Sequence, residues 1–411
     1  MEESFSNRTQ TILVKSKKRD ELLFLELQSL ASFPFYAFLK SKREDVLAAR
    51  EAFFASGTLP NFPYQRAHTF DAAAYIESAE SFQSHVSDSS EDPKLCELYE
   101  AKCEELIHRA KLILAIQEKN DENITAQSEA LFGEVIPKDE LHTEWKDMVK
   151  NASQFHEHKK PVDAEAFKEM VERVLTYYDM HGFDVRLSNR SSVKVTHRVF
   201  YQPRICIPKT LQISRARAAR LLTHEVEVHA LRTWNGIQSP YYLLWRGLDR
   251  YLRTDEGLAV HFQVRVSGTE PKHAPGFWDA YSVSLAKVGS FTETFEALKY
   301  ARTELAEKMG KKDPESIGQD SAWRLCLRAY RGITDLSEPG VGFFRDHIYR
   351  SGLRDVRKAI EKYGTESVGR LFVGNVGIHH LPLLEHLSLK NARTPDMVSK
   401  HIVQEVMRKK K

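Results

Sequence analysis

The stretch 183–208 constrains the fold of this chain most, because its sequence pattern is typical of short strands. Its segments FDVRLS, SVKVTHRVFY and RICIP are rich in β-branched residues, partly alternate and are separated by turn residues. That pattern predicts a small sheet. Helical spacing of apolar residues dominates elsewhere, as over Leu95–Ile116 and Phe167–Tyr178. We therefore expect an α+β fold: a helical N-terminal part, then a mostly helical domain that carries one small sheet.

The length of 411 residues exceeds what one ordinary hydrophobic core serves, so two or three structural units are expected. A charged, proline-marked break at Lys159–Pro161 is the predicted boundary between a helical N-terminal region, 1–160, and a second domain, 161–411. Near the C terminus, Thr394 as a cap and Pro395 at the first helical position predict the start of the last helix.

The composition excludes several classes of protein. With 42% apolar and 28% charged residues, the chain is neither mainly disordered nor fibrous. Its 60 basic and 57 acidic residues leave a net charge of +3, which gives no electrostatic case for nucleic acid or for an anionic membrane. The chain has no membrane-length apolar run, no signal-peptide pattern and no CxxC pair among four cysteines. We expect a soluble, reduced, cytoplasmic protein.

The sharpest chemical signal is the segment HEVEVH, from His224 to His229, inside a helix predicted to begin at Ser214. Neutral imidazoles bind zinc well, and a neighbouring carboxylate such as Glu225 can act as a general base. In the common HExxH pattern the histidines share one helix face, but a spacing of five would point them about 140° apart on an ideal helix. A π-bulge can absorb the inserted residue. An amphipathic helix with two incidental histidines is the alternative.

A third metal donor follows downstream in the segment RTDEGLA. Glu256 lies 27 residues after His229, in what we expect to be the first turn of the next helix. Its neighbour Gly257 would let another helix approach closely. Taken alone, this acid is a solvated charge at a helix start. Together with the upstream motif, Glu256 is the best candidate for the third zinc ligand.

The two motifs in this order, HEVEVH and then DEGLA, resemble the tyrosine carboxypeptidase family. Its animal members are the microtubule-associated tyrosine carboxypeptidases, and its bacterial relatives carry QEGLA. The resemblance covers about the last 250 residues. It implies a zincin-like catalytic domain over 161–411, in which His224, His229 and Glu256 bind one Zn²⁺ per chain and Glu225 is the general base. Asp255 stands where glutamine is usual, which leaves the metal ligand intact.

Substrate contacts are expected from a second part of the resemblance, between Tyr330 and Tyr349. Arg331 or Arg345 would bind a terminal carboxylate, and Tyr349 would stabilise an oxyanion. The family has a lysine where Arg345 stands. Surface salt bridges are the alternative for these residues. The segment Arg204–Pro208 is placed to be the edge strand beside the zinc helix, with a plain core strand as the alternative.

These observations predict a zinc metallocarboxypeptidase that removes a C-terminal residue, with tyrosine as the residue the resemblance implies. The expected partner is a peptide or protein C terminus. The chain has no long basic extension of the kind we associate with microtubule attachment, so tubulin enters only by family analogy. The alternatives are a non-catalytic regulator that keeps zinc for structure, and an endopeptidase or aminopeptidase on the same zinc site.

Overall fold

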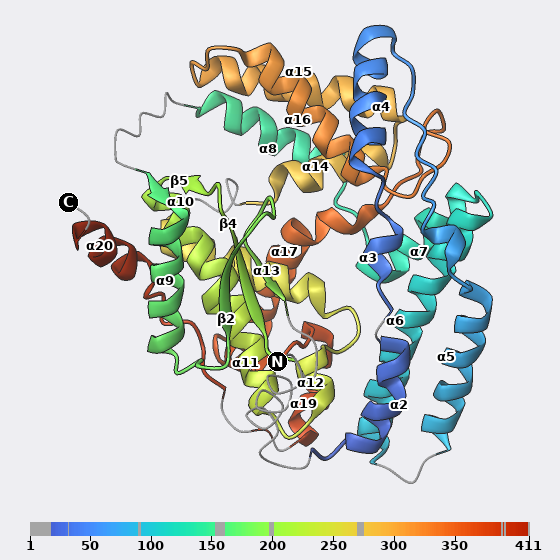
Figure 1. Ribbon diagram of the computed structural model, residues 1–411, viewed down its shortest axis with the longest axis vertical. Coiled ribbons are helices and arrows are strands. Elements are labelled where there is room, and N and C mark those ends of the chain that lie inside the picture. Colours follow the sequence, from blue (N-terminus) through green and yellow to red (C-terminus); the bar gives the residue numbers. More distant parts are fainter. Residues whose placement is uncertain are drawn as a thin grey trace, which may run out of the picture.

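The computed structural model describes residues 18–31, 33–88, 92–152, 161–196, 201–268, 275–387, 389 and 392–409. These residues form a mostly helical fold around small sheets, which confirms the α+β expectation. Figure 1 shows β2 and β4 in the middle of the molecule, with α9 beside them. The predicted break at Lys159–Pro161 begins within 153–160, which lie outside the described residues.

Helices alone form the described part of the chain before the break. They are α2 (Glu21–Ala31), α3 (Phe35–Phe38), α4 (Arg43–Ser56), the short 3₁₀ turn η1 (Ala67–Thr69), α5 (Ala72–Ser87), α6 (Pro93–Gln117), α7 (Asp121–Phe132) and α8 (Lys138–Lys150). The central helix of this group, α6, matches the predicted helix closely. Asp92 caps it by accepting a hydrogen bond from the backbone of Lys94, and Pro93 occupies the first turn, where its missing N–H costs nothing.

The predicted sheet forms from the three predicted segments. It contains β2 (Asp184–Ser188), β3 (Lys194–Thr196) and β4 (Arg204–Pro208), in the order β2-β4-β3. The strand β4 pairs with β2 in parallel and with β3 antiparallel, and its residues 205–208 are buried. Residues 197–200, part of the predicted SVKVTHRVFY segment, lie outside the described residues. A second, two-stranded sheet pairs β1 (Val162–Asp163) with β5 (Gln212–Ile213).

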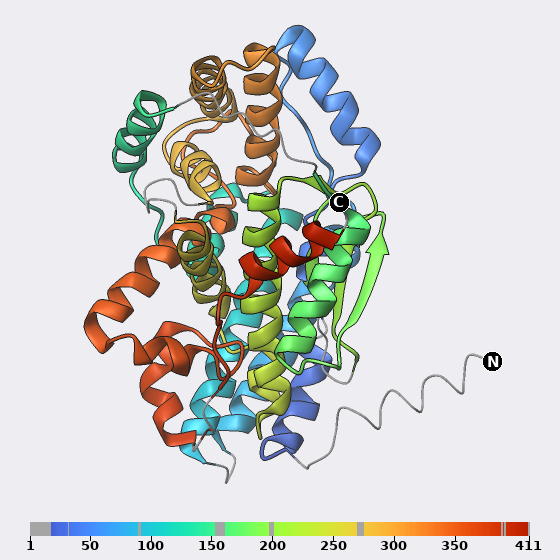
Figure 2. The same ribbon diagram turned by 90° about the vertical axis from the view of Figure 1, so that its left-hand side faces the viewer.

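The remaining elements are again helical. They are α9 (Ala164–Tyr177), α10 (Arg215–Leu222), η2 (Thr223–Ala230), α11 (Leu231–Gln238), α12 (Tyr242–Arg246), α13 (Tyr251–Ser267), α14 (Phe277–Ala286), α15 (Phe291–Lys308), α16 (Pro314–Ala329), η4 (Phe344–His347), α17 (Ile348–Tyr363), α18 (Glu366–Leu371), η5 (Ile378–His380), α19 (Leu381–Leu384), η6 (Glu385–Leu387) and α20 (Ser399–Lys409). Figure 2 shows the dark red C-terminal helix α20 lying against the green α9, with which it is in contact.

The last helix begins later than the sequence predicted. Thr394 and Pro395 lie outside any helix, and α20 starts at Ser399. The first N–H groups of α20 are paired with a carboxylate from a distant element. The backbone N–H groups of Val398 and Ser399 donate to the buried side chain of Glu227, at 3.0 and 3.2 Å. A partner 172 residues away in sequence therefore determines where the helix begins, so the expected cap at Thr394 is wrong.

Two hydrophobic cores hold the described residues together. One surrounds the helical segment that carries HEVEVH. It includes Leu23 and Leu106 from helices before the predicted boundary and Val226 and Val406 from helices after it. The other lies under α15 and α16 and includes Phe53 and residues from 277–348. Each core thus takes residues from both sides of the predicted boundary near 160. The boundary itself stays a prediction.

One stretch, Glu21–Ser56, is long and apolar enough to cross a membrane by length and composition alone. The structure divides it into α2, α3 and α4. Within α2, Phe24 and Leu27 are fully buried in the first core. Core helices pass the same test of length and composition, and this burial favours the interpretation of α2 as a core helix.

Candidate active site

The segment that carries HEVEVH forms a continuous helical path from Arg215 to Gln238, made of α10, η2 and α11. Ser214 caps its start by accepting a hydrogen bond from the backbone N–H of Arg217, as the sequence predicted. The middle part, η2, is a π-helix over Thr223–Ala230. The wider π turn accommodates the extra residue, and the His224 and His229 rings lie 4.7 Å apart between centroids. The π distortion that could absorb the inserted residue is therefore present.

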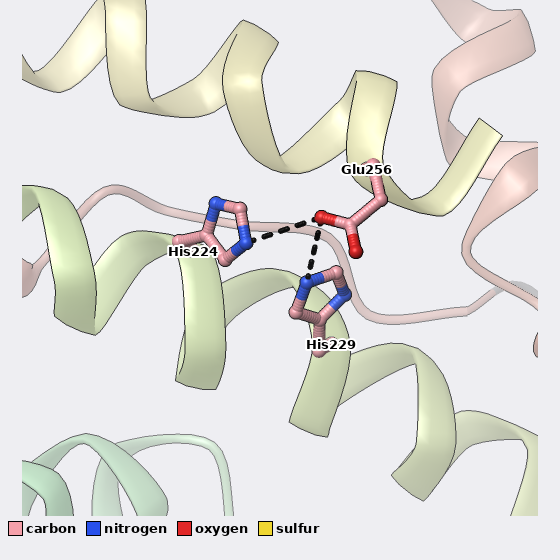
Figure 3. Close-up of side chains that lie close together, drawn as sticks. All are labelled: His224, His229 and Glu256. Carbon is pink, nitrogen blue, oxygen red and sulfur yellow. Dashed lines mark ion pairs between the residues drawn. The ribbon is translucent and has the colours of Figure 1, made fainter. Parts of the chain in front are cut away.

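Glu256 brings the third donor atom to these histidines. Its Oε2 lies 3.3 Å from Nε2 of His224 and 3.6 Å from Nε2 of His229, as Figure 3 shows. The three side chains are only 10–14% exposed. All three potential ligand atoms lie within 4.8 Å of one another. The structure thus brings together the three residues predicted as ligands.

The donor set fits a zinc ion. Ligand atoms about 2 Å from a tetrahedral zinc lie roughly 3.3 Å apart, close to the separations from Glu256 Oε2 to the two imidazoles. This Oε2 atom is buried and has no hydrogen-bond partner among the described residues. A buried carboxylate oxygen without a partner is costly unless a cation binds it. The chemistry of two imidazoles and one carboxylate is also that of a zinc site with an open position.

Glu256 is held in place by the packing of its helix, α13. The sequence analysis expected Glu256 in the first turn of its helix. The helix begins at Tyr251, so Glu256 lies in the second turn and that expectation is wrong. Its neighbour Gly257 lies directly against Gly352 of α17, where a side chain on either residue would overlap the backbone of the other helix. The close helix approach expected at Gly257 is therefore confirmed. It fixes α13 against the helix that carries Tyr349.

Two residues next to the ligands were missed as partners by the sequence analysis. Asp255 Oδ2 lies 2.8 Å from Nδ1 of His229, and its Oδ1 pairs with the guanidinium of Arg232. Arg232 is fully buried. The sequence does contain a signal for this pair, since Asp255 directly precedes a predicted ligand and Arg232 lies three residues after His229 on the same predicted helix.

Charges in the site change the proton affinities of its groups. Burial would raise the pKa of Glu256, but the nearby imidazoles of His224 and His229 outweigh it and hold that pKa well below its usual range. Burial would also raise the pKa of Asp255, but the charges of His229 and Arg232 outweigh it and lower that pKa to about 2. Burial lowers the pKa of His229, but Asp255 and then Glu256 raise it well above its usual value. The carboxylates of Glu256 and Asp255 are therefore ionised at neutral pH.

Glu225 lies beside the ligand triad and next to the sheet. Burial raises its pKa, which the two histidines and a hydrogen bond from the backbone N–H of Val195 partly offset. Val195 belongs to β3, which contacts η2. The edge strand of the sheet that lies beside η2 is thus β3. Of the two interpretations of Arg204–Pro208, the edge strand is wrong and the plain core strand is confirmed, because β4 pairs on both sides and is the middle strand.

The residues predicted to contact substrate separate into two groups. Tyr349 and Arg345 lie near the triad: the Glu256 charge and then burial raise the pKa of Tyr349 well above its usual value, and Arg345 opposes them. Arg345 donates from Nε to the hydroxyl of Tyr36 at 3.1 Å and from one terminal nitrogen to Asp346 at 2.9 Å. Arg331 instead stacks over the ring of Phe343, 5.9 Å from its centroid.

A second group of histidines and an aspartate forms away from the triad. Asp249 accepts hydrogen bonds from Nε2 of His380 at 2.6 Å and of His379 at 3.2 Å. Nδ1 of His380 accepts from the backbone N–H of Gly377 at 2.9 Å, so its hydrogen is on Nε2. The potential ligand atoms of Asp249, His379 and His380 lie close enough together to bind a metal ion. His380, however, has no free lone pair with which to bind it.

Comparison with known proteins agrees with this site. Residues 51–408 match the family model described as microtubule-associated tyrosine carboxypeptidase. The chain is 31% identical over 211 residues to a mouse (Mus musculus) protein named "Putative tyrosine carboxypeptidase MATCAP2", a match that covers 48% of this chain and 36% of that protein. It is 29% identical over 201 residues to human (Homo sapiens) "Microtubule-associated tyrosine carboxypeptidase 1", covering 46% and 36%.

The extent of these matches decides what they establish. The family model covers most of the chain, including both motifs and the segment up to Tyr349. The matched part spans only about a third, 36%, of the length of each of these two relatives. This chain belongs to the microtubule-associated tyrosine carboxypeptidase family.

Proposed function

We propose that this protein is a zinc-dependent carboxypeptidase that removes one C-terminal residue from a peptide or protein. The observation that carries the proposal is the convergence of His224, His229 and Glu256 on one point, with Glu225 beside it. Three protein donors and an adjacent base are typical of catalytic zinc sites, whereas structural sites are normally closed by four donors. The names of the relatives support the class of reaction.

In this proposal His224, His229 and Glu256 hold one Zn²⁺ per chain. When bound, the zinc ion acts as a Lewis acid that polarises the scissile carbonyl and makes a nearby water more acidic. Glu225 accepts the proton of the attacking water and delivers it to the leaving amine. The raised pKa of Glu225, due first to burial, suits a group that takes up and releases a proton.

The substrate residues follow from what surrounds the triad. The charge of Arg345 interacts with those of Glu256 and Tyr349, so Arg345 is our candidate for binding the terminal carboxylate. Hydrogen bonds to Tyr36 and Asp346 hold its guanidinium in place. Tyr349 would donate its hydroxyl hydrogen to the developing oxyanion. The free edge of β3 offers backbone groups next to Glu225 for an extended peptide. Arg331 lies over the ring of Phe343 and is the weaker candidate.

The substrate itself is inferred by family. The relatives' names point to tyrosine as the residue released, and one of them to microtubules. Because the matched part covers only a third of those proteins, tubulin remains an analogy for this chain. A cytoplasmic location stays a prediction from the sequence.

The test uses two matched peptides that end in tyrosine, one with a free terminal carboxylate and one amidated. They are incubated with the zinc-loaded protein and followed by mass spectrometry. Loss of a single residue from the free acid alone supports a carboxypeptidase. An amide offers the partly buried guanidinium of Arg345 no carboxylate to pair with, which costs roughly 2–5 kcal/mol, so cleavage should fall at least about tenfold.

The control is Glu225→Gln, which keeps the size of the side chain and removes the proton acceptor. Hydrolysis should fall by about two to four orders of magnitude while the protein stays folded and zinc-bound. Equal cleavage of both peptides, or cuts in the interior, would favour an endopeptidase. Unchanged hydrolysis by the Glu225→Gln protein would contradict the general-base assignment, and no hydrolysis of any peptide by the wild type would favour a non-catalytic regulator.

A further inference from the structure

A carboxylate links one of the two histidines to a buried guanidinium. Asp255 uses one oxygen for each contact: Oδ2 lies 2.8 Å from Nδ1 of His229, and Oδ1 pairs with Arg232. Asp255 is 7% exposed and Arg232 is not exposed at all. An ion pair so well shielded from water is less screened than a surface pair. The geometry of Asp255 is therefore well defined.

Arg232 is itself held from three sides. Its Nε donates to the carbonyl of Leu371 at 3.0 Å, and one terminal nitrogen donates to the carbonyl of Val376 at 2.5 Å. The other terminal nitrogen pairs with Asp255. The planar guanidinium has its donors in a fixed arrangement, so three partners leave it little freedom to move.

The segment that holds Arg232 also holds the helix that carries Glu256. The backbone N–H of Ile378, two residues after Val376, donates to the hydroxyl of Thr254 at 3.0 Å. Asn235, on α11, donates from its side chain to the carbonyl of Phe372 at 2.7 Å. Residues 371–378 thus connect α11, next to the histidines, with the start of α13. Asp255 and Arg232 lie at the centre of this connection.

The two histidines differ in how they are held. An imidazole that gives its Nδ1 hydrogen to a carboxylate has its Nε2 lone pair free for a metal, and its ring is fixed in orientation. His229 has such a carboxylate in Asp255. Among the described residues, the carboxylate that pairs with His224 is the predicted ligand Glu256, on its Nε2, and none pairs with its Nδ1. Support from a neighbouring carboxylate is therefore concentrated on His229.

We propose that Asp255, held by Arg232, is a positioning residue that fixes His229 in its metal-binding orientation and thereby sets the zinc affinity of the site. The inference rests on the proposed function only in assuming that the triad binds zinc. Partners of this kind typically change metal affinity by about 10–100-fold when they are mutated. The measurement is accordingly metal binding, and no peptide substrate is needed.

The decisive variant is Asp255→Asn in the full chain. An asparagine has one acceptor oxygen, so it can accept from His229 or from Arg232, while its amide group faces the other donor. The zinc dissociation constant, measured by competition with a chromophoric chelator, should rise by about 10–100-fold. With Co²⁺ in place of zinc, the visible absorption bands should shift, because the ligand ring is no longer held in one orientation.

The matched control is Asp20→Asn, which removes a carboxylate that is also buried, 2% exposed, and lies outside the site. Asp20 accepts hydrogen bonds from Tyr99 and from the backbone of Tyr242 and Leu243. Its loss should lower stability and leave the zinc dissociation constant and the Co²⁺ spectrum unchanged. If Asp255→Asn does not fold, Asp255→Glu carries the same comparison, with the carboxylate kept but displaced and a smaller loss of zinc affinity than in Asp255→Asn.

The outcomes separate the two proposals. A wild-type protein that binds no zinc overturns the proposed function and this inference together. A wild type that binds zinc, with an Asp255→Asn protein whose zinc affinity and Co²⁺ spectrum match those of the wild type, overturns the inference alone. An equal loss of affinity in Asp20→Asn would also overturn it, since the effect would then follow from lost stability and not from the position of His229.

Discussion

Gly257 of α13 and Gly352 of α17 lie backbone against backbone. A Cβ atom on Gly352 would lie 3.0 Å from the Cα of Gly257 and would overlap the carbonyl of Arg253. The contact is made by backbone against backbone, so no side chain can move to make room. Glu256 directly precedes Gly257, and Tyr349 is the second residue of α17, so this contact helps to set the distance between the predicted ligand helix and a predicted substrate residue.

Gly257→Ala and Gly352→Ala should each destabilise the protein. Overpacking typically costs about 1–3 kcal/mol, and here the backbone must shift. Unfolding by urea, followed by circular dichroism, measures the free energy of unfolding. The control is Gly369→Ala in α18, where the nearest atom to a new Cβ is 3.9 Å away. That variant should be neutral or slightly stabilising, since alanine favours a helix by about 0.5–1 kcal/mol over glycine. Equal effects at all three positions would contradict this account.

Zinc should bind at one equivalent per chain and should depend on the triad alone. Alanine in place of His224, His229 or Glu256 removes one of three donors, so metal content after dialysis should fall toward zero. His380→Ala changes a histidine of the second group, whose Nε2 already donates to Asp249. Its zinc content, measured by inductively coupled plasma mass spectrometry, should equal that of the wild type. Full occupancy in Glu256→Ala would mean that the third ligand is another residue.

The two candidate arginines should differ in their effect on cleavage. Arg345→Gln removes the charge that acts on the site, so kcat/KM for a peptide with a free C terminus should fall at least about tenfold. Arg331→Gln should have a much smaller effect, because Arg331 faces Phe343. An amidated peptide should be insensitive to both changes. The reverse order of the two arginines would identify Arg331 as the carboxylate-binding residue.

Acid should destabilise the fold through His347. This side chain is fully buried in η4, and burial, followed by the charge of Arg253, lowers its pKa to about 3. The unfolded chain takes up a proton near pH 6.5, whereas the folded chain stays neutral until about pH 3. The unfolded state therefore binds more protons across this window, and stability falls as the pH drops, by about 1.4 kcal/mol per unit at most.

The test is the pH dependence of stability in His347→Leu. This variant has no proton to bind in either state, so its free energy of unfolding should vary less between pH 6.5 and 4 than that of the wild type. Stability at pH 7 can fall in the variant without affecting the comparison, since only the slope is tested. Identical slopes for the two proteins would show that other groups govern acid unfolding.

The sequence predicted the elements whose signals are local. The strands formed where β-branched residues alternate, α6 formed between Asp92 and Gln117, and the five-residue histidine spacing led to the expected π distortion. The predicted ligands lie together because their motifs occupy two helices packed against each other. In each case the information lies within one segment of the chain or in the spacing of a motif.

Predictions that needed a distant partner were wrong or absent. The start of α20 depends on Glu227, which also accepts a hydrogen bond from the hydroxyl of Tyr178 at 2.8 Å. The middle position of β4 depends on strand order, which the three segments do not reveal. The contact between Asp255 and Arg232 joins two helices whose relative rotation the sequence does not specify. These features follow from tertiary packing and not from local propensity.

The two cores also have a consequence for how the protein is made. A ribosome releases the chain from its N terminus, and domains with local contacts can fold as they emerge. Here Leu23 and Phe24 pack in a core that includes Val403 and Val406, so that core is complete only after α20 has been synthesised. Until then, part of the apolar surface of the early helices stays exposed to solvent. We expect nascent chains to bind chaperones that recognise such surfaces, and truncation before α20 to leave an aggregating product.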